Sequence, residues 1–185
     1  MKLTEENRKK MLMQRGKELA FLLRHDAEAF RMGVIDEHGW RSLADLRMEH
    51  HFLPAIVKEI VETDDKQRYE MSKDGKRIRA RQGHSIPVDV ELKEATPPDV
   101  LYHGTKEHLF FGPIMKDGLK PMKRLYVHLS KDVETATKVG NRRKGNLYII
   151  KIDAKQMTED GCKFWLSNNG VWLTEKVEPK YFIYE

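Results

Sequence analysis

The stretch that most constrains the fold is the pair of prolines in KEATPPDV, residues 93–100. Proline lacks a backbone N–H and fixes φ, so Thr96-Pro97-Pro98 cannot continue a helix or a central strand. The hydrophobic pattern also changes there, from helical periods to short strand-like runs. A chain of 185 residues is long enough for two small domains. We therefore predict one domain over residues 1–95 and a second over residues 96–185.

Three segments of the first half show helical features. In residues 5–25, Leu12, Leu19 and Leu23 keep to one helix face. The segment from Pro54 onward repeats apolar residues at i, i+3, i+4, i+7 and i+8. Ser42 and Asp45 fit a capping box that opens another helix at residues 43–50. The first half is therefore predicted to begin with three helices.

A basic hairpin follows these helices. Asp74-Gly75 is a turn signal between two strand-like runs, and period two places the arginines of the second run on one face. These arginines are Arg77, Arg79 and Arg81. Three helices followed by a basic hairpin are typical of a winged helix. Residues 66–81 and 123–144 each carry seven cations against two acids, which favours a polyanionic partner such as nucleic acid over a merely solvated surface.

The second half reads as short strands with two or three short helices. Two strands each lead into a helix, a buried strand and a hairpin follow, and a final strand closes the chain. The segments are VLYHGT (100–105), LYVHLS (125–130), NLYIIKIDA (146–154), KFWLSNNGVWL (163–173) and KYFIYE (180–185). Together with the helical first half, this predicts an α+β fold class.

Composition excludes several kinds of site. A single cysteine, Cys162, allows neither a disulfide framework nor a thiolate zinc site, and we expect no metal. No apolar run approaches the roughly 20 residues that span a bilayer. The polar N-terminus lacks a secretory apolar stretch. We expect a cytoplasmic protein without a membrane or an obligate protein partner.

Histidines and arginines gather beside turn residues. LLRH (22–25) places two cations at a helix end, which suits an anion or merely complements the helix dipole. QGHS (82–85), YHGT (102–105) and RLYVHLS (124–130) place histidines next to small residues and hydroxyls. These histidines could also be buried, hydrogen-bonded core residues. The residues alone predict a phosphate-handling site, and their spacing does not reveal the use of NAD.

Six motifs in order add a resemblance. LLRH, DKQRYEM, QGHS, YHGT, RLYVHLS and NNGVWLT together closely resemble the NAD-dependent RNA 2′-phosphotransferase family, best known from tRNA splicing. The resemblance runs from about Leu19 to the C-terminus. It implies an N-terminal winged-helix lobe followed by a C-terminal ADP-ribosyltransferase-like lobe of short antiparallel strands with few helices.

The resemblance also implies roles for particular residues. Four residues match the family's essential catalytic quartet: Arg24, His25, Arg68 and Arg124. His103, His128 and Val171 match the three motif positions of the ADP-ribosyltransferase fold. With their neighbours they form the expected NAD-binding set: His103, Gly104, Thr105, His128, Leu129, Ser130 and Val171. A glutamate often activates the nucleophile at the third position, but a 2′-phosphate dianion needs no activation, so Val171 is compatible with the reaction.

The implied reaction consumes NAD⁺ as a co-substrate. The 2′-phosphate of a tRNA-like RNA attacks C1″ of the nicotinamide ribose and expels nicotinamide, which gives an ADP-ribosylated 2′-phospho-RNA intermediate. The ribose 2″-hydroxyl then attacks the phosphorus, releasing 2′-OH RNA and ADP-ribose 1″,2″-cyclic phosphate. Two alternatives remain open: an ADP-ribosyltransferase that stops after modifying terminal phosphates of nucleic acid, and a non-catalytic winged-helix nucleic-acid-binding protein. Nicotinamide release would distinguish the binding protein, and cyclic phosphate would distinguish the two enzymes.

Overall fold

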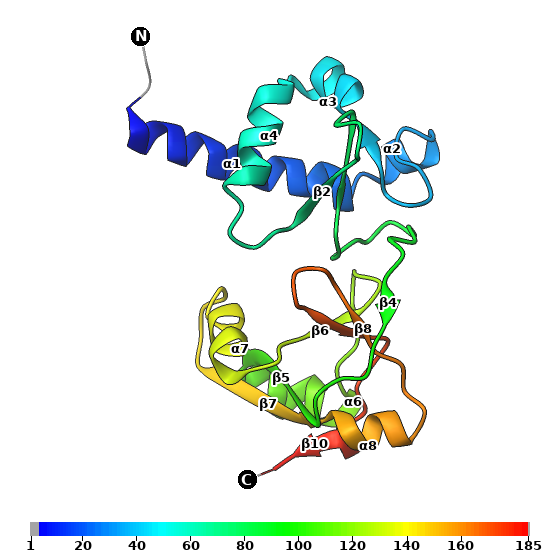
Figure 1. Cartoon of the computed structure of the whole chain (residues 1–185). Helices are drawn as coiled ribbons and strands as arrows, with labels where there is room; N and C mark the ends of the chain where they lie inside the picture. Colours follow the sequence, from blue (N-terminus) through cyan, green and yellow to red (C-terminus); the bar gives the residue numbers. More distant parts are fainter. Residues whose placement is uncertain (1–3, 185) are drawn as a thin grey trace. The chain divides into compact units, whose positions relative to one another are not determined.

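The computed structural model describes residues 4–184 (Figure 1). The chain divides into two compact units, Met1–Glu91 and Leu92–Glu185. This division falls just before strand β4 (Lys93–Glu94), which pairs with Leu166 and Trp165 of unit 2. The predicted boundary follows residue 95, on the other side of this strand. The mixture of helices and antiparallel sheets confirms the α+β class.

The helices of unit 1 begin and end where side chains cap them. Helix α1 (Glu5–Arg24) and helix α4 (Pro54–Glu62) confirm the predicted segments. Helix α3 (Leu43–His50) starts at Ser42, whose Oγ accepts a hydrogen bond from the N–H of Ala44 at 3.1 Å. In a capping box the Asp45 carboxylate would also accept a hydrogen bond from the backbone N–H of Ser42. That part of the prediction is wrong, because the carboxylate accepts from Arg41 Nε at 2.5 Å instead.

A further helix, α2 (Ala27–Arg31), follows the end of α1 almost at once. Asp26 caps it, since its Oδ1 accepts from the N–H of Ala29 at 3.0 Å. Gly33 ends this segment with φ of +73°. Between α1 and α2 the chain turns at His25, the C-cap of α1.

The predicted basic hairpin lies in a small antiparallel sheet with strand order β1-β3-β2. The strands are β1 (Arg41–Ser42), β2 (Tyr69–Met71) and β3 (Arg77–Ala80). Gly75 makes the turn with φ of +67°, a conformation that glycine adopts at little cost. Ile78 and Ala80 are completely buried against the helices, as the period-two pattern predicts. Other members of this core include Leu19, Leu23, Leu46, Phe52 and Val57.

Unit 2 contains two antiparallel sheets, with strand orders β10-β7-β5 and β4-β8-β9-β6. The strands that follow β4 are β5 (Val100–Lys106), β6 (Val127–Leu129), β7 (Leu147–Asp153), β8 (Trp165–Leu166), β9 (Trp172–Thr174) and β10 (Phe182–Ile183). The predicted segment KYFIYE therefore contains β10, and its last residue, Glu185, lies outside the described residues. Tyr102 and Ser130 join β5 to the end of β6 through an isolated bridge.

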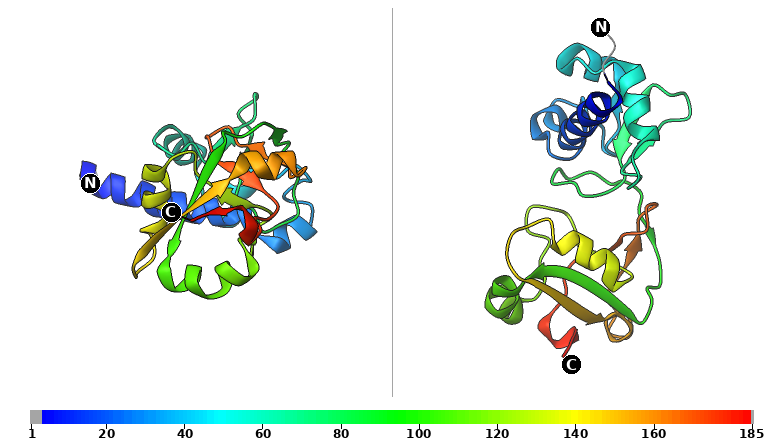
Figure 2. Two further views of the ribbon diagram at one scale, coloured as in Figure 1. Left: turned by 90° about the horizontal axis from the view of Figure 1, so that it is seen from below. Right: turned by 90° about the vertical axis from the view of Figure 1, so that its left-hand side faces the viewer.

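Helices cover the long strands of unit 2. The helical segments are α5 (Glu107–Leu109), a π-helical turn (Phe110–Ile114), α6 (Met115–Asp117), α7 (Val133–Gly140), α8 (Ala154–Glu159) and a 3-10 turn (Pro179–Tyr181). Helix α7 packs along β5 and β7 (Figure 2). The approach is closest at Gly104, where a Cβ atom would lie 1.9 Å from the carbonyl oxygen of Ala136. Only glycine therefore fits at this point of β5.

Candidate active-site residues

In unit 1 the QGHS loop lies against the end of α1. The N–H of Ser85 donates to the carbonyl oxygen of Arg24 at 3.0 Å, and Ser85 Oγ lies 2.9 Å from Nδ1 of His25. Gly83, with φ of +91°, passes close to the guanidinium of Arg24, because a Cβ there would lie 3.5 Å from its Nε. The structure thus brings together two motifs that are about sixty residues apart in the sequence.

Arg68 also belongs to this part of unit 1. Its guanidinium forms an ion pair with Asp64, and its backbone N–H donates to the same carboxylate at 2.6 Å. Asp64 is almost completely buried, whereas Arg68 remains about one-third exposed. The pKa of the neighbouring Tyr69 hydroxyl rises to about 12 because it is buried, while the charges of Arg24 and Arg68 oppose that rise. Arg24 and Arg68 therefore act on one common neighbour.

His84 is a buried histidine of the same loop that the sequence motifs did not assign. It is 2% exposed, and its Nε2 has no hydrogen-bond partner within the described residues. Burial, followed by the charges of Arg24, His25 and Arg79, lowers the pKa of His84 to about 3, so its imidazole is neutral at physiological pH. A signal for its burial was present, since His84, Ile86 and Val88 alternate with exposed residues.

In unit 2 the two predicted histidines meet at neighbouring strands. His103 on β5 donates from Nδ1 to the carbonyl oxygen of His128 on β6 at 3.0 Å, and His128 Nδ1 donates to the carbonyl oxygen of Tyr126 at 3.1 Å. Burial lowers the pKa of His103, the hydrogen bond to His128 opposes this, and the charge of Arg124 lowers it further. A neutral His103 with its proton on Nδ1 presents Nε2 as an acceptor.

The remaining predicted NAD-binding positions divide into two groups. Ser130 and Val171 lie near these histidines, because Ser130 bridges to Tyr102 and the β6–β9 register places Val171 level with Ser130. By contrast, Gly104 contacts α7, Leu129 is 2% exposed in the core, and Thr105 is also buried. These three residues can shape the strands, but Gly104 has no side chain and those of Leu129 and Thr105 are not displayed on the surface.

Arg124 is an exposed residue that precedes β6. Surrounding protein atoms lower the pKa of its guanidinium, and the charges of Arg142 and Arg143 lower it further. It remains a cation, and its charge reaches His103. Unit 2 therefore combines the Nε2 acceptor of His103 with a donor set, the Ser130 hydroxyl and the Arg124 guanidinium, that fits the riboses and pyrophosphate of a dinucleotide.

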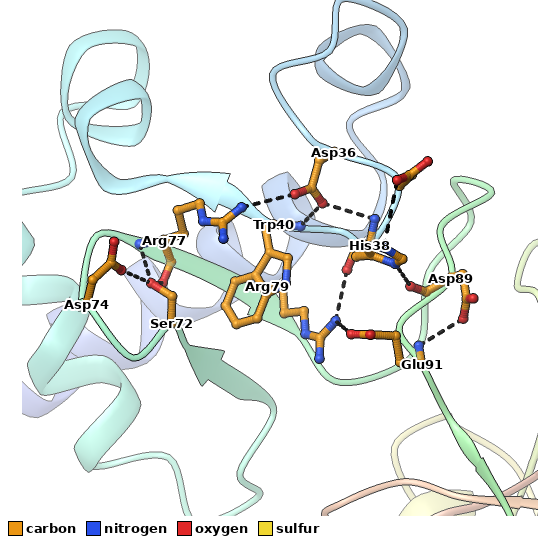
Figure 3. Close-up of polar contacts among 10 residues, drawn as sticks. Asp36, His38, Trp40, Ser72, Asp74, Arg77, Arg79, Asp89 and Glu91 are labelled. Carbon is orange, nitrogen blue, oxygen red and sulfur yellow. Dashed lines mark hydrogen bonds and ion pairs between the residues drawn. The ribbon is translucent and has the colours of Figure 1, made fainter.

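The three arginines predicted to bind RNA have protein partners, and Figure 3 shows two of them, Arg77 and Arg79 of β3. Arg77 is exposed and pairs with Asp36 at 3.2 Å. Arg79 is buried, pairs with Glu70 at 3.1 Å and Glu91 at 2.9 Å, and lies over the ring of Trp40. Arg81 donates from Nε to the carbonyl oxygen of Tyr69 at 2.8 Å. Their RNA-binding role stays a prediction, and the contacts of Arg79 give it a structural task within unit 1.

Two other kinds of feature are absent from the described part of the chain. Within residues 4–184, no cluster of three or more histidine, cysteine or acidic side chains has an arrangement that could hold a metal ion. In the same range, no helix has the length and apolar character needed to cross a bilayer.

Comparison with known proteins decides the family. Residues 10–176 match the model of the "RNA 2'-phosphotransferase, Tpt1 / KptA family". The chain belongs to the RNA 2′-phosphotransferase family. Proteins named "Probable RNA 2'-phosphotransferase" from Acaryochloris marina and Hahella chejuensis are 44% and 46% identical to it, over 170 and 177 residues. These alignments cover 89% and 93% of this chain and 92% and 94% of the relatives.

A protein of the same name from Agrobacterium fabrum is 42% identical over 168 residues. That alignment covers 88% of this chain and 89% of the relative. The matched regions of all three relatives extend over both units of the chain. Membership of the RNA 2′-phosphotransferase family therefore confirms the resemblance that the six motifs predicted.

Proposed function

We propose that this protein removes a 2′-phosphate from RNA by transferring it to NAD⁺, which is consumed as a co-substrate. The observation that carries the proposal is a family match that spans both units, combined with the motif residues that lie together within each unit. The coarser activity, RNA 2′-phosphotransfer, is the one that the relatives' names state. The use of NAD⁺ rests on the resemblance and on the donor set of unit 2.

The proposed first step forms a bond between a 2′-phosphate oxygen and C1″ of the nicotinamide ribose. Nicotinamide leaves with the electron pair of the broken C–N bond. The phosphate dianion is already a competent nucleophile, so it needs no base. Arginine forks and an imidazole suit its capture, because charge-assisted hydrogen bonds contribute about 1.5–3 kcal/mol each. Arg24, His25 and Arg68 are the unit-1 groups for this task.

The proposed second step breaks the phosphorus bond to the RNA 2′-oxygen. The 2″-hydroxyl attacks phosphorus and loses its proton, and the RNA 2′-oxygen leaves as a hydroxyl after gaining one. Negative charge on the non-bridging oxygens is largest in this transition state, so cations that hold the phosphate accelerate the step. The products are 2′-OH RNA and ADP-ribose 1″,2″-cyclic phosphate.

We also propose the finer fold assignments that the resemblance implies. In unit 1, the helices and the β2–β3 hairpin with β1 alongside are the parts of a winged helix. In unit 2, two short antiparallel sheets bridged at Tyr102 and Ser130 suit an ADP-ribosyltransferase-like lobe. A tRNA-like substrate, a role in tRNA splicing and a cytoplasmic location remain predictions.

The deciding experiment incubates the protein with an oligonucleotide that carries one internal 2′-phosphate, with and without NAD⁺, and measures masses. We expect loss of the phosphate, free nicotinamide and the cyclic phosphate product, all dependent on NAD⁺. An RNA that retains its phosphate and gains ADP-ribose would support the ADP-ribosyltransferase alternative. RNA binding without nicotinamide release would support the non-catalytic alternative.

A further inference from the structure

The loop between α7 and β7 carries three consecutive cations. Arg142, Arg143 and Lys144 are all exposed, and they follow Asn141, the C-cap of α7. Among the ion pairs of residues 4–184, none joins any of these three side chains to a carboxylate. The loop therefore presents positive charge that the described part of unit 2 leaves without an acidic partner.

Hydrogen bonds hold this loop at both ends. At its start, the N–H of Arg142 donates to the carbonyl oxygen of Val139 at 3.2 Å. At its end, Lys106 Nζ donates to the carbonyl oxygen of Gly145 at 2.8 Å, and Lys106 is only 3% exposed. The cations are thus presented on an anchored loop, which lowers the ordering cost when a ligand binds.

The same loop is tied to the chain after β5. The N–H of Glu107 donates to the carbonyl oxygen of Asn146 at 3.0 Å, and Asn146 Nδ2 donates to Oε2 of Glu107 at 2.9 Å. Strand β5, which carries His103, therefore also supports the loop.

The charges of this loop reach Arg124. Those of Arg142 and Arg143 act on the Arg124 guanidinium, so three like charges influence one another. The C-terminus of α7 carries only about half a negative charge, and Lys138 already lies in its last turn. The helix dipole therefore accounts for less than one of these cations.

The arginines of β3 differ from those of this loop in their ion pairs. Arg77 and Arg79 also belong to a basic stretch, but each pairs with a carboxylate of unit 1. Arginines with carboxylate partners must give up those ion pairs to bind an anion, whereas the loop arginines have no such pair within residues 4–184. The loop is thus the better phosphate-binding surface of the two.

We propose that Arg142 and Arg143 bind a backbone phosphate of the RNA substrate. This inference rests on the proposed function, because it assumes that RNA is the substrate. An exposed loop suits an extended polyanion that runs over the surface, whereas small ligands favour concave sites. Guanidinium groups match phosphate oxygens with two parallel donors.

The test compares two double variants of the full chain. Arg142→Gln with Arg143→Gln removes the proposed phosphate ligands, and Lys155→Gln with Lys163→Gln removes two exposed cations of unit 2 elsewhere. Equilibrium binding is measured for a 2′-phosphorylated oligonucleotide at several salt concentrations, and separately for NAD⁺. Binding needs no turnover, so the result is independent of whether the reaction proceeds as proposed.

We expect the arginine variant to bind RNA about tenfold more weakly. Its log–log salt slope should fall by roughly 0.7 for each RNA phosphate that the protein no longer neutralises. Its affinity for NAD⁺ should stay within about twofold, and the lysine variant should keep the parent slope. An unchanged slope in the arginine variant, or equal losses in both variants, would overturn the proposal. Weaker binding of NAD⁺ with unchanged RNA binding would also overturn it and would assign the loop to the pyrophosphate.

Discussion

Ser85 Oγ lies 2.9 Å from His25 Nδ1, and the backbone N–H of the same serine donates to the carbonyl oxygen of Arg24. The hydroxyl also lies within 3.5 Å of that carbonyl oxygen. If the hydroxyl donates to the carbonyl, its oxygen accepts the Nδ1 proton of His25. Ser85 is thereby placed to fix the tautomer and the ring orientation of His25.

Replacing Ser85 by alanine should therefore lower kcat for 2′-phosphate transfer by about tenfold, the order expected for the removal of one charge-assisted hydrogen bond. The KM for NAD⁺ should change little. Steady-state kinetics on the phosphorylated oligonucleotide measure both. Ser85→Thr keeps the hydroxyl and should restore most of the rate. Equal losses in both variants would contradict the positioning role and indicate damage to the loop.

The rates of the two chemical steps should depend differently on Arg68. Its ion pair with buried Asp64 orients the guanidinium, and charge on the phosphate is greatest in the second step. We expect Arg68→Ala to slow the second step more than the first, so that ADP-ribosylated RNA accumulates in rapid-quench time courses. Arg24→Ala should slow both steps by weakening phosphate capture. Complete loss of activity in Arg68→Ala with no intermediate at any time would refute this division.

His84 should make the protein sensitive to acid. Its native pKa is about 3, whereas an unfolded histidine titrates near 6.5, so below that value the unfolded chain binds the extra proton. Stability is complete above pH 6.5 and falls as the pH decreases towards 3. Between pH 6 and pH 4 this proton binding lowers the stability by about 2.5 kcal/mol. Urea unfolding of the parent and of His84→Gln should therefore show a smaller loss over this range in the variant.

The exposed His38 provides a control of opposite sign. The hydrogen bond from its Nδ1 to the carbonyl oxygen of Asp89 is the main cause of its raised pKa. Its stabilising contribution is present below pH 6.5 and is lost as the pH rises through the raised value. His38→Gln should therefore leave the loss between pH 6 and pH 4 as in the parent, and should alter the dependence of stability on pH only above about pH 6.5. The same change in both variants would show that the His84 effect is not one of proton binding.

Replacement of Arg77 and replacement of Arg79 should lower the free energy of unfolding by different amounts, although the two residues lie only two positions apart on β3. Arg79→Ala removes a buried cation from Glu70 and Glu91, which remain partly exposed, so we expect a loss of about 2 kcal/mol. Arg77→Ala removes one exposed ion pair and should cost about 0.5 kcal/mol. Urea denaturation measures both changes. Equal losses would mean that the burial of Arg79 has no energetic consequence.

Local sequence patterns predicted the helices and strands that are determined by residues close together in the chain. The period of the leucines indicated α1, Asp74-Gly75 indicated the hairpin, and alternation placed Ile78 and Ala80 inward. Helix α2 was missed because it spans only residues 27–31, too few for a helical period to emerge.

Contacts between distant residues were beyond the reach of these patterns. Arg41 is 3% exposed and pairs with Asp26 at 2.9 Å and Asp45 at 2.5 Å, and its Nη2 lies 3.0 Å from His50 Nε2. Nothing in the sequence around Arg41 indicates that two segments will enclose it. Likewise, the arginine alternation on β3 identified one face but not the carboxylates that face it.

In the candidate site, too, the sequence identified residues by their motifs but did not reveal their contacts with distant residues. Motif order identified the two histidines that meet at 3.0 Å in unit 2. It did not reveal that Leu129 is buried in the core, because a residue's motif position says nothing about which side of a strand it occupies. Nor did it identify Ser85 as the partner of His25, since that contact depends on how the loop returns to α1.

The close approach of α7 at Gly104 has a consequence for the pairing of the sheet. Tyr102, Gly104 and Lys106 point to one face of β5, so a slip of two residues would keep every apolar side chain on its proper side. Such a slip would also bring a Cβ atom to within 1.9 Å of the Ala136 carbonyl oxygen. A single missing methyl group thus selects one alignment of β5 among those that hydrophobic alternation permits. In selecting it, Gly104 also sets which residue of β5 stands opposite His128 and which one reaches the loop of Gly145.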